Sequence, residues 1–267
     1  MPSFSLGTPS PKASSGSRRL TLTILIRHTG GWEAGGFAQK LAYVYARKMD
    51  VINRGLGGYN SEWGIPAFEQ MFTKDKTGTH PKCKLLTIWF GANDACLPFS
   101  NQHVPLDKYQ QNLTWMVQAL RTPSSEYYAP WTRIILLTPP PIQVDAWAQH
   151  IAERDPPKDM DRTWENTKAY ADAAKEVARE LRVPVVDAWD AIWKAAGEET
   201  LGLTRFLSDG LHLTREGYEV VYNELIKVIE KEYPELHYDK LPLILPAWDT
   251  VDPKNPRASV VSHYVDV

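Results

Sequence analysis

Short apolar runs alternate along this chain with longer segments in which apolar residues recur at helical spacing. Residues 20–26 are mostly Leu, Ile and Thr, and residues 84–90 form a continuous apolar run. Strands that are buried on both faces have this pattern. Shorter runs at residues 50–53, 133–138 and 183–187 have the same character. The pattern therefore predicts roughly five strands, the number typical of an open sheet.

The segments between these strands carry the periodicity of amphipathic helices. Residues 35–49, 106–121, 162–181 and 216–231 repeat apolar side chains at i, i+3 and i+4. Strands that alternate with helices are joined by right-handed crossovers, which produce a parallel sheet. We therefore predict the fold class as α/β: a three-layer α/β/α sandwich of about five parallel strands flanked by helices.

Length and local composition indicate a single domain with two tails. The chain has 267 residues, enough to bury one full core. Residues 1–19 are rich in Ser, Pro and Gly and are expected to form a disordered leader. Residues 20–235 are predicted to form the domain. Residues 236–267, rich in prolines and aromatics, are predicted to be an extension that packs on it.

Charge and apolar content exclude several classes of partner. The net charge is −2, with both signs interspersed, so the sequence predicts no nucleic-acid partner and no attraction to an anionic membrane. No apolar run reaches the roughly 18 residues of a membrane span. Residues 20–26 are short for a signal peptide and are followed by no small-residue cleavage site. We expect a cytoplasmic protein, with Cys83 and Cys96 as reduced thiols. A homodimer is compatible with this composition.

The residues that carry the clearest chemistry are Asp209 and His212, in the segment Asp209-Gly-Leu-His212. An aspartate three residues before a histidine on a short turn can direct its carboxylate at one imidazole nitrogen. The other nitrogen can then take a proton from a hydroxyl. Thr214 is a plausible N-cap, so the pair is expected on the loop that enters the last long helix. An isolated pair at this spacing is usually a surface or capping contact.

Two other segments are expected at the same edge of the sheet, because ligands bind outside the carboxyl ends of parallel strands. Residues 54–61 (Arg-Gly-Leu-Gly-Gly-Tyr-Asn-Ser) follow the second strand, and residues 91–95 (Gly-Ala-Asn-Asp-Ala) follow the third. Each has a simpler interpretation as an ordinary tight turn. A dinucleotide site is disfavoured, because the first segment lacks the third glycine of that motif and leads into no clear helix.

Taken together, the three segments resemble the signature blocks of the SGNH (GDSL-type) hydrolases. Those blocks are a Gly-x-x-Gly after the second strand, Gly-Ala-Asn-Asp after the third, and Asp-Gly-Leu-His near the C-terminus. Residues 47–55, 90–96 and 208–213 are most similar to the isoamyl acetate-hydrolysing esterase branch. The resemblance extends from about residue 30 to residue 238.

The resemblance implies a role for each block. His212 is expected to be the general base and Asp209 the residue that orients it. The backbone N–H of Gly58 and the side-chain amide of Asn93 are expected to donate to the oxyanion of a tetrahedral intermediate. The implied substrate is a small, short-chain ester, and the implied chemistry needs no cofactor and no metal. Three aromatic residues could line an acyl or alcohol pocket or simply pack in the core: Trp32, Tyr59 and Trp63.

The nucleophile of the family is missing from this sequence. The family places it in a Gly-Asp-Ser motif directly after the first strand, and that position falls near Ile26, in the segment Ile24-Leu-Ile-Arg-His-Thr29. Isoleucine cannot attack a carbonyl carbon. Thr29 and Ser61 are the nearest substitutes, but Thr29 is hindered and the resemblance gives Ser61 no catalytic role. The hydroxyls of the leader lie upstream of the strand: Ser14, Ser15 and Ser17.

Three explanations for the missing serine remain open at the level of sequence. The polypeptide made in the cell could differ from this sequence, for example through a mis-joined exon boundary near residue 30. The chain could be a non-catalytic relative that binds an ester, an acyl ligand or a protein. It could also be an enzyme with a displaced nucleophile. The resemblance thus predicts an ester hydrolase, and the alternative is an SGNH-like binding protein.

Overall fold

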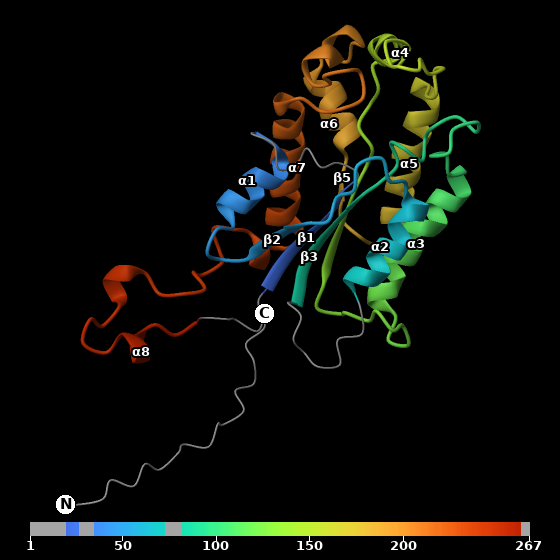
Figure 1. Cartoon of the computed structure of the whole chain (residues 1–267). Helices are drawn as coiled ribbons and strands as arrows, with labels where there is room; N and C mark the ends of the chain where they lie inside the picture. Colours follow the sequence, from blue (N-terminus) through green and yellow to red (C-terminus); the bar gives the residue numbers. More distant parts are fainter. Residues whose placement is uncertain (1–19, 27–34, 73–81, 263–267) are drawn as a thin grey trace, which may run out of the picture.

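A computed structural model describes residues 20–26, 35–72 and 82–262 of the chain. Its centre is one parallel sheet formed by β1 (Leu20–Ile26), β2 (Asp50–Asn53), β3 (Lys82–Trp89), β4 (Arg133–Leu137) and β5 (Val185–Val186). The strand order is β2-β1-β3-β4-β5, and every neighbouring pair runs parallel (Figure 1). The predicted parallel sheet is therefore confirmed.

Helices cover both faces of this sheet (Figure 1). One layer contains α1 (Phe37–Val44), α6 (Ala188–Ala195) and α7 (Arg215–Glu232). The other contains α2 (Ser61–Met71), α3 (Leu106–Arg121) and α5 (Trp164–Leu181). The arrangement is the three-layer α/β/α sandwich expected from the sequence. A further helix, α4 (Val144–Ala152), follows the loop after β4.

The central strand β3 explains why the sequence reads there as an unbroken apolar run. Alternate side chains of a strand point to opposite faces of the sheet. Leu85 and Trp89 belong to the cluster that packs under α1 and α7, whereas Leu86 and Ile88 belong to the cluster under α3 and α5. Both faces of β3 are therefore core, and both need apolar side chains.

Four of the described α-helices were not predicted: α2, α4, α6 and the short α8 (Pro256–Ser259). The expectation that no clear helix follows the glycine segment is therefore wrong. α2 begins directly after that segment, where the Asn60 side chain accepts from the backbone N–H of Trp63 at 2.8 Å. Gly64 and Pro66 lie inside this helix and obscure its apolar stripe. α4 and α6 are short, and prolines precede each of them. β5 is shorter than expected because Pro184 has no N–H to donate to the sheet.

The C-terminal segment begins in the core and then leaves it. Residues of η3 (Pro234–Leu236) and Leu241 contribute buried side chains, and the N–H of Ile244 donates to the carbonyl of Arg47 at 2.7 Å. Figure 1 shows the rest, with η4 (Trp248–Thr250) and α8 (Pro256–Ser259), as an arm beyond the body of the domain. Trp248 on this arm is 88% exposed.

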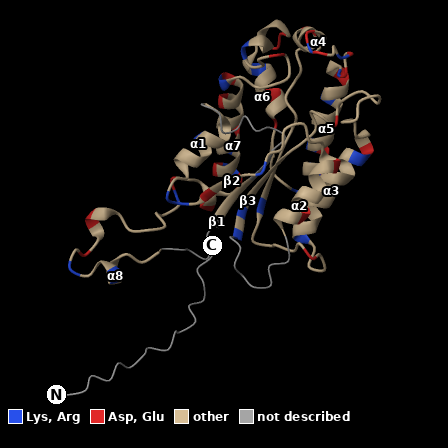
Figure 2. Ribbon diagram, in the orientation of Figure 1, with Lys and Arg blue, Asp and Glu red and all other residues tan. Residues whose placement is uncertain are grey.

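The surface of the described residues carries charges of both signs. Lys and Arg residues are interspersed with Asp and Glu residues along the described part of the chain (Figure 2). This agrees with the net charge of −2. In the part of the chain that the structure describes, no helix is long and apolar enough to cross a membrane.

Candidate active site

The three segments singled out in the sequence all lie at the carboxyl edge of the sheet. Residues 54–60 follow β2, and residues 90–96 follow β3. Residues 206–214 lie between η2 (Leu201–Arg205) and α7. β2 is added on one side of β1, and β3, β4 and β5 follow on the other side, so the order of strands in the sheet reverses between β1 and β3. Ligand sites in open α/β sheets form at such a switch point.

Asp209 and His212 are in direct contact. The Nδ1 atom of His212 lies 2.5 Å from Oδ2 of Asp209, and the backbone N–H of His212 donates to Oδ1 at 2.8 Å. The N–H of Leu211 donates to the same Oδ1 at 3.0 Å. The aspartate therefore fixes both the ring and the backbone of the histidine. With Nδ1 committed to the carboxylate, Nε2 is the nitrogen placed for proton transfer.

These bonds determine the ionisation of Asp209. Burial by itself would raise the pKa of this carboxyl, but the hydrogen bonds from His212 and Leu211 outweigh it and hold the pKa well below the usual range. Hydrogen bonds to the charged form of an acid favour that form. Asp209 is thus an anion in contact with an imidazole, which is the pairing that a general base requires.

Gly210 allows the turn that joins the two residues to pack against α4. Its φ is +89°, a left-handed conformation that favours glycine. Its carbonyl accepts from the N–H of Gln143 at 2.9 Å. A Cβ at this position would lie 2.4 Å from the Gln143 carbonyl oxygen and 2.5 Å from the Trp147 nitrogen. Only glycine permits this close approach.

α4 contributes two side chains next to the Asp–His pair that sequence reasoning missed. The Trp147 ring meets the His212 ring edge-on, with centroids 5.9 Å apart. Nε2 of His150 lies 3.7 Å from Oδ2 of Asp209 and also contacts the Arg154 guanidinium at 3.1 Å. Trp147 and His150 are three residues apart and share one helix face. Their spacing was a usable signal only once α4 itself was recognised.

The glycine segment after β2 presents its backbone near the same edge. Gly58 has a φ of +81°. The side-chain amide of Gln102 donates to its carbonyl oxygen at 2.6 Å, and the Asn60 amide donates to the Gln102 carbonyl at 3.0 Å. Gln102 therefore fixes the peptide unit on one side of Gly58. Nothing in the sequence pattern pointed to Gln102.

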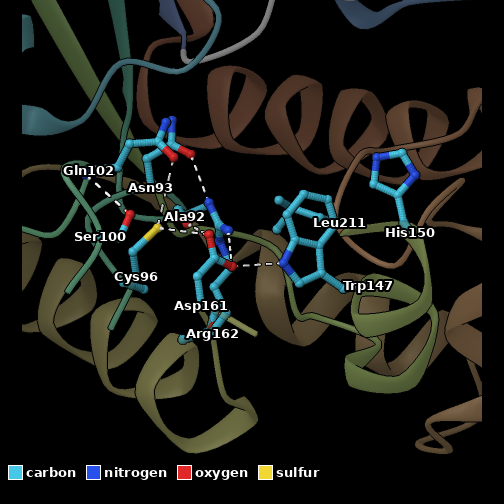
Figure 3. Close-up of polar contacts among 12 residues, drawn as sticks. Ala92, Asn93, Cys96, Ser100, Gln102, Trp147, His150, Asp161, Arg162 and Leu211 are labelled. Carbon is cyan, nitrogen blue, oxygen red and sulfur yellow. Dashed lines mark hydrogen bonds and ion pairs between the residues drawn. The ribbon is translucent and has the colours of Figure 1, made fainter. Parts of the chain in front are cut away.

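Asn93 connects the segment after β3 to this glycine segment. Its Nδ2 donates to the carbonyl of Tyr59 at 2.7 Å. Its Oδ1 accepts from the Arg162 guanidinium at 3.1 Å (Figure 3). The two expected oxyanion donors, Gly58 and Asn93, are thus joined through the residue next to Gly58. An amide NH2 carries two hydrogens, so one bond to Tyr59 leaves a second hydrogen to donate.

Asp94 anchors the same two segments from inside the protein. It is fully buried and accepts from the N–H of Ser61 at 2.8 Å and from the N–H of Gly91 at 3.0 Å. Burial raises the pKa of this carboxyl, and its hydrogen bonds oppose that rise. The role of Asp94 is therefore to hold backbone, and the expected site residues lie in the loops around it.

Ser61, considered above as a substitute nucleophile, is in the interior. Its exposed fraction is 0%, and its hydroxyl accepts from the Asn112 amide at 2.9 Å. A substrate carbonyl cannot reach a hydroxyl that is enclosed in this way. The burial follows from its place in the first turn of α2, which packs on α3.

Of the three aromatic pocket candidates, two are described. Tyr59 and Trp63 meet edge-on with centroids 6.0 Å apart, and Trp63 is 40% exposed. Tyr59 directly follows Gly58 in the glycine segment, and Trp63 lies in the first turn of α2. Trp32 lies outside the described residues, as do Thr29 and the serines of the leader.

The expected nucleophile position is the last residue of β1. Its backbone is described, with Ile24 paired to Asn53 of β2 and Ile26 paired to Trp89 of β3. Residue 26 therefore ends β1 between the strands that lead to Gly58 and to Asn93. A hydroxyl here would lie at the switch point of the sheet, and isoleucine supplies none.

Comparison with known sequences agrees with the family resemblance noted in the sequence. The model of the GDSL-like lipase/acylhydrolase family matches residues 25–220. A mouse protein named isoamyl acetate-hydrolyzing esterase 1 homolog is 34% identical over 256 residues, which cover 94% of this chain and 96% of that protein. A GDSL esterase/lipase of Arabidopsis thaliana is 36% identical over 230 residues, covering 84% of this chain and 90% of the plant protein.

Comparison with solved structures agrees with the fold. A lipase/acylhydrolase from Enterococcus faecalis superposes with a TM-score of 0.52 at 23% identity, covering 85% of this chain and 98% of that one. A catalytic mutant of an acetylxylan esterase from Geobacillus stearothermophilus superposes with a TM-score of 0.57 at 20% identity, covering 81% and 96%. At these identities the likeness is one of architecture.

Proposed function

The chain belongs to the GDSL-like lipase/acylhydrolase family, and from that membership we propose that it is a carboxylic ester hydrolase for small, acetate-like esters. The observation that carries the proposal is the contact between Asp209 and His212 at the edge of the sheet where residue 26, Gly58 and Asn93 converge. The preference for small esters rests on relatives named for the hydrolysis of isoamyl acetate.

The proposed mechanism uses each residue for one task. A hydroxyl at the end of β1 attacks the ester carbonyl and gives its proton to Nε2 of His212, while Asp209 stabilises the imidazolium. The N–H of Gly58 and Nδ2 of Asn93 donate to the oxyanion. The tetrahedral intermediate collapses, and His212 returns the proton to the departing alcohol. Water then releases the carboxylic acid by the same route, with His212 again as the base.

The side chain at position 26 decides whether this sequence completes the cycle. Loss of the nucleophile of a serine hydrolase costs on the order of 10⁶ in kcat. We propose that the active form of the protein carries Gly-Asp-Ser at residues 24–26. A mis-joined exon boundary near residue 30 would explain why Ile26 occurs in a chain that retains Asp209, His212, Gly58 and Asn93. The second candidate function, ester binding without turnover, is favoured by Ile26 itself.

Two measurements separate these possibilities. The first is hydrolysis of p-nitrophenyl acetate by this chain and by the variant Ile24→Gly/Leu25→Asp/Ile26→Ser. We expect turnover only in the variant, abolished by His212→Ala, and falling as the acyl chain lengthens from acetate to decanoate. Turnover by the unchanged chain that His212→Ala abolishes would establish a displaced nucleophile instead.

The second measurement is the sequence of the transcript across the codons of residues 20–32. A message that encodes Ile24 to Thr29 as written contradicts the mis-joined boundary. If the variant is also inactive although folded, and the chain binds the ester, then the protein is a binding protein and the proposed hydrolase function is wrong.

A further inference from the structure

The orientation of the Asn93 amide is set by its two partners. A side-chain amide can rotate by 180°, which exchanges its oxygen and nitrogen. The Arg162 guanidinium can only donate, and the Tyr59 carbonyl can only accept. Rotation would place the amide NH2 against the guanidinium and the amide oxygen against a carbonyl. The observed orientation, with Oδ1 toward Arg162 and Nδ2 toward Tyr59, is therefore the stable one.

Arg162 is held in place by every nitrogen of its side chain. Its Nε donates to the carbonyl of Ala92 at 3.1 Å, and its two terminal nitrogens donate to Asp161 at 2.6 Å and to Asn93 at 3.1 Å. The side chain is only 2% exposed. The guanidinium thus contacts both the backbone and the side chain of the segment after β3.

The same guanidinium is linked to the residues around His212. Asp161 Oδ1, which accepts from Arg162, also accepts from Nε1 of Trp147 at 2.8 Å. The guanidinium carbon lies 5.0 Å from the centre of the Trp147 ring, which also packs edge-to-face with the His212 ring. Figure 3 shows Arg162 and Asp161 between Asn93 on one side and Trp147 on the other.

The burial of the Arg162 guanidinium needs a reason beyond stability. Taking a guanidinium out of water is costly, and a buried charge can often be replaced by an apolar residue with little loss when its partner is replaced as well. An apolar side chain at position 162 could fill the space but could not donate to Asn93 or Ala92. The fixed, planar set of donors of arginine is what this position uses.

We propose that Arg162 is a positioning residue that keeps Nδ2 of Asn93 directed at the oxyanion, and that Asp161 and Trp147 tie this arrangement to the general base. The inference rests on the proposed function, in which Asn93 donates to the oxyanion. Arg162 itself touches no reacting atom. It acts through Asn93.

The first test needs no activity. The side-chain amide of Asn93 is followed by ¹⁵N NMR in the full chain, with its signals assigned by Asn93→Ala. We expect Arg162→Met to shift or broaden these signals, and Arg162→Lys to do so as well while preserving a charge for Asp161. The control is Arg154→Met. The Arg154 guanidinium also lies over the Trp147 ring, at 5.4 Å, but the arginine that donates to Asn93 is Arg162. Unchanged Asn93 signals in both Arg162 variants, or an equal change in the control, would overturn the proposal.

The second test uses the chain with Gly-Asp-Ser at residues 24–26. Arg162→Lys is expected to lower kcat at least 10-fold with KM within about 3-fold, approaching the 10²–10³-fold loss typical of one oxyanion donor. Combined with Asn93→Ala it should add nothing, because Arg162 acts only through the donor that Asn93→Ala removes. The control is Arg133→Met, which removes a guanidinium that pairs with Glu235 and lies over the Tyr233 ring. An unchanged kcat, or additive losses, would overturn the proposal. If the parent chain is inactive, the proposed function fails, and the NMR result still decides the role of Arg162.

Discussion

The carboxylate of Asp209 contacts His212 through both of its oxygens. Oδ2 lies 2.5 Å from the imidazole Nδ1, and Oδ1 accepts the backbone N–H of the same residue at 2.8 Å. One oxygen therefore sets the direction of the ring, and the other closes the turn that carries it. A single substitution at Asp209 removes both effects, so this contact links the stability of the loop to the chemistry proposed for it.

Stability should depend on pH through Asp209. The bonds from His212 and Leu211 hold its pKa below the usual range against the opposing effect of burial. An aspartate with a depressed folded-state pKa stabilises the fold above its unfolded pKa of about 3.9, and this contribution is lost as the pH falls further. We expect Asp209→Asn to be less stable than the parent at pH 7, with the difference shrinking below about pH 4.

Urea unfolding followed by circular dichroism at pH 7, 5 and 3 measures this difference. The matched control is Asp145→Asn, which alters an exposed aspartate in the first turn of α4. A gap between parent and Asp209→Asn that stays constant from pH 7 to pH 3 contradicts the prediction, because it would mean that the charge of Asp209 contributes nothing.

The close contact between Gly210 and α4 predicts a large effect of a single methyl group. Gly210→Ala combines a positive φ with a Cβ only 2.4 Å from a backbone oxygen. Gly197 has a similar φ of +75°, but a Cβ there would meet nothing within 4 Å. We expect Gly197→Ala to lower the free energy of unfolding by about 1 kcal/mol, and Gly210→Ala by at least about 2 kcal/mol more. If denaturant titrations give equal losses for the two variants, the close contact between Gly210 and the backbone at the start of α4 does not limit the residue at this position.

Gly58 and Gly57 provide a similar pair in the glycine segment. A Cβ at Gly58 meets only Gln102, at an ordinary 3.5 Å, so its cost comes from the φ of +81° alone. We expect Gly58→Ala to lose about 1–2 kcal/mol of stability and Gly57→Ala, with open space and no positive φ, to change it by less than about 0.5 kcal/mol. In the chain with Gly-Asp-Ser, kcat should fall in Gly58→Ala and not in Gly57→Ala. A reversed order contradicts the assignment of the donor.

The sequence predicted elements best where the burial pattern is simple, either on both faces of a strand or on one face of a helix. β3 is apolar on both faces, and its position was predicted to within two residues because no other element of that length has such a run. The helix over residues 106–121 was also predicted at its full length, since one face packs on the sheet and the other meets water. α2 was missed because Gly64 and Pro66 interrupt its stripe.

Some residues of the candidate site were predicted from the sequence, and others were not. The blocks at Gly58, Asn93 and Asp209 to His212 were visible as short runs with known spacing. Arg162 was not, because it was assigned to the start of a helix that begins at Trp164, and an arginine at a helix start is usually solvated. Its role depends on a loop path that brings it to Asn93, 69 residues away in sequence. Periodicity carries no information about such contacts.

Substitution of Ser61 should change the stability of the fold without changing the turnover of ester. Its hydroxyl is buried and bonded to Asn112, and Asp94 accepts from the Ser61 backbone. Ser61→Ala leaves the Asn112 amide without this partner, so we expect a loss of about 1–3 kcal/mol in unfolding experiments. Ester turnover per folded molecule should remain within a few-fold of the parent, because this hydroxyl cannot reach a substrate.

A nucleophile at Ser61 would behave differently, since its removal costs on the order of 10⁶ in kcat. The comparison is made in whichever parent turns over ester, the unchanged chain or the one with Gly-Asp-Ser. Asn112→Ala is the matched variant, because it breaks the same hydrogen bond and keeps the serine. Near-normal turnover in both variants supports a purely structural hydroxyl. Turnover that Ser61→Ala abolishes and Asn112→Ala retains would make Ser61 the nucleophile and refute our placement of it in the core.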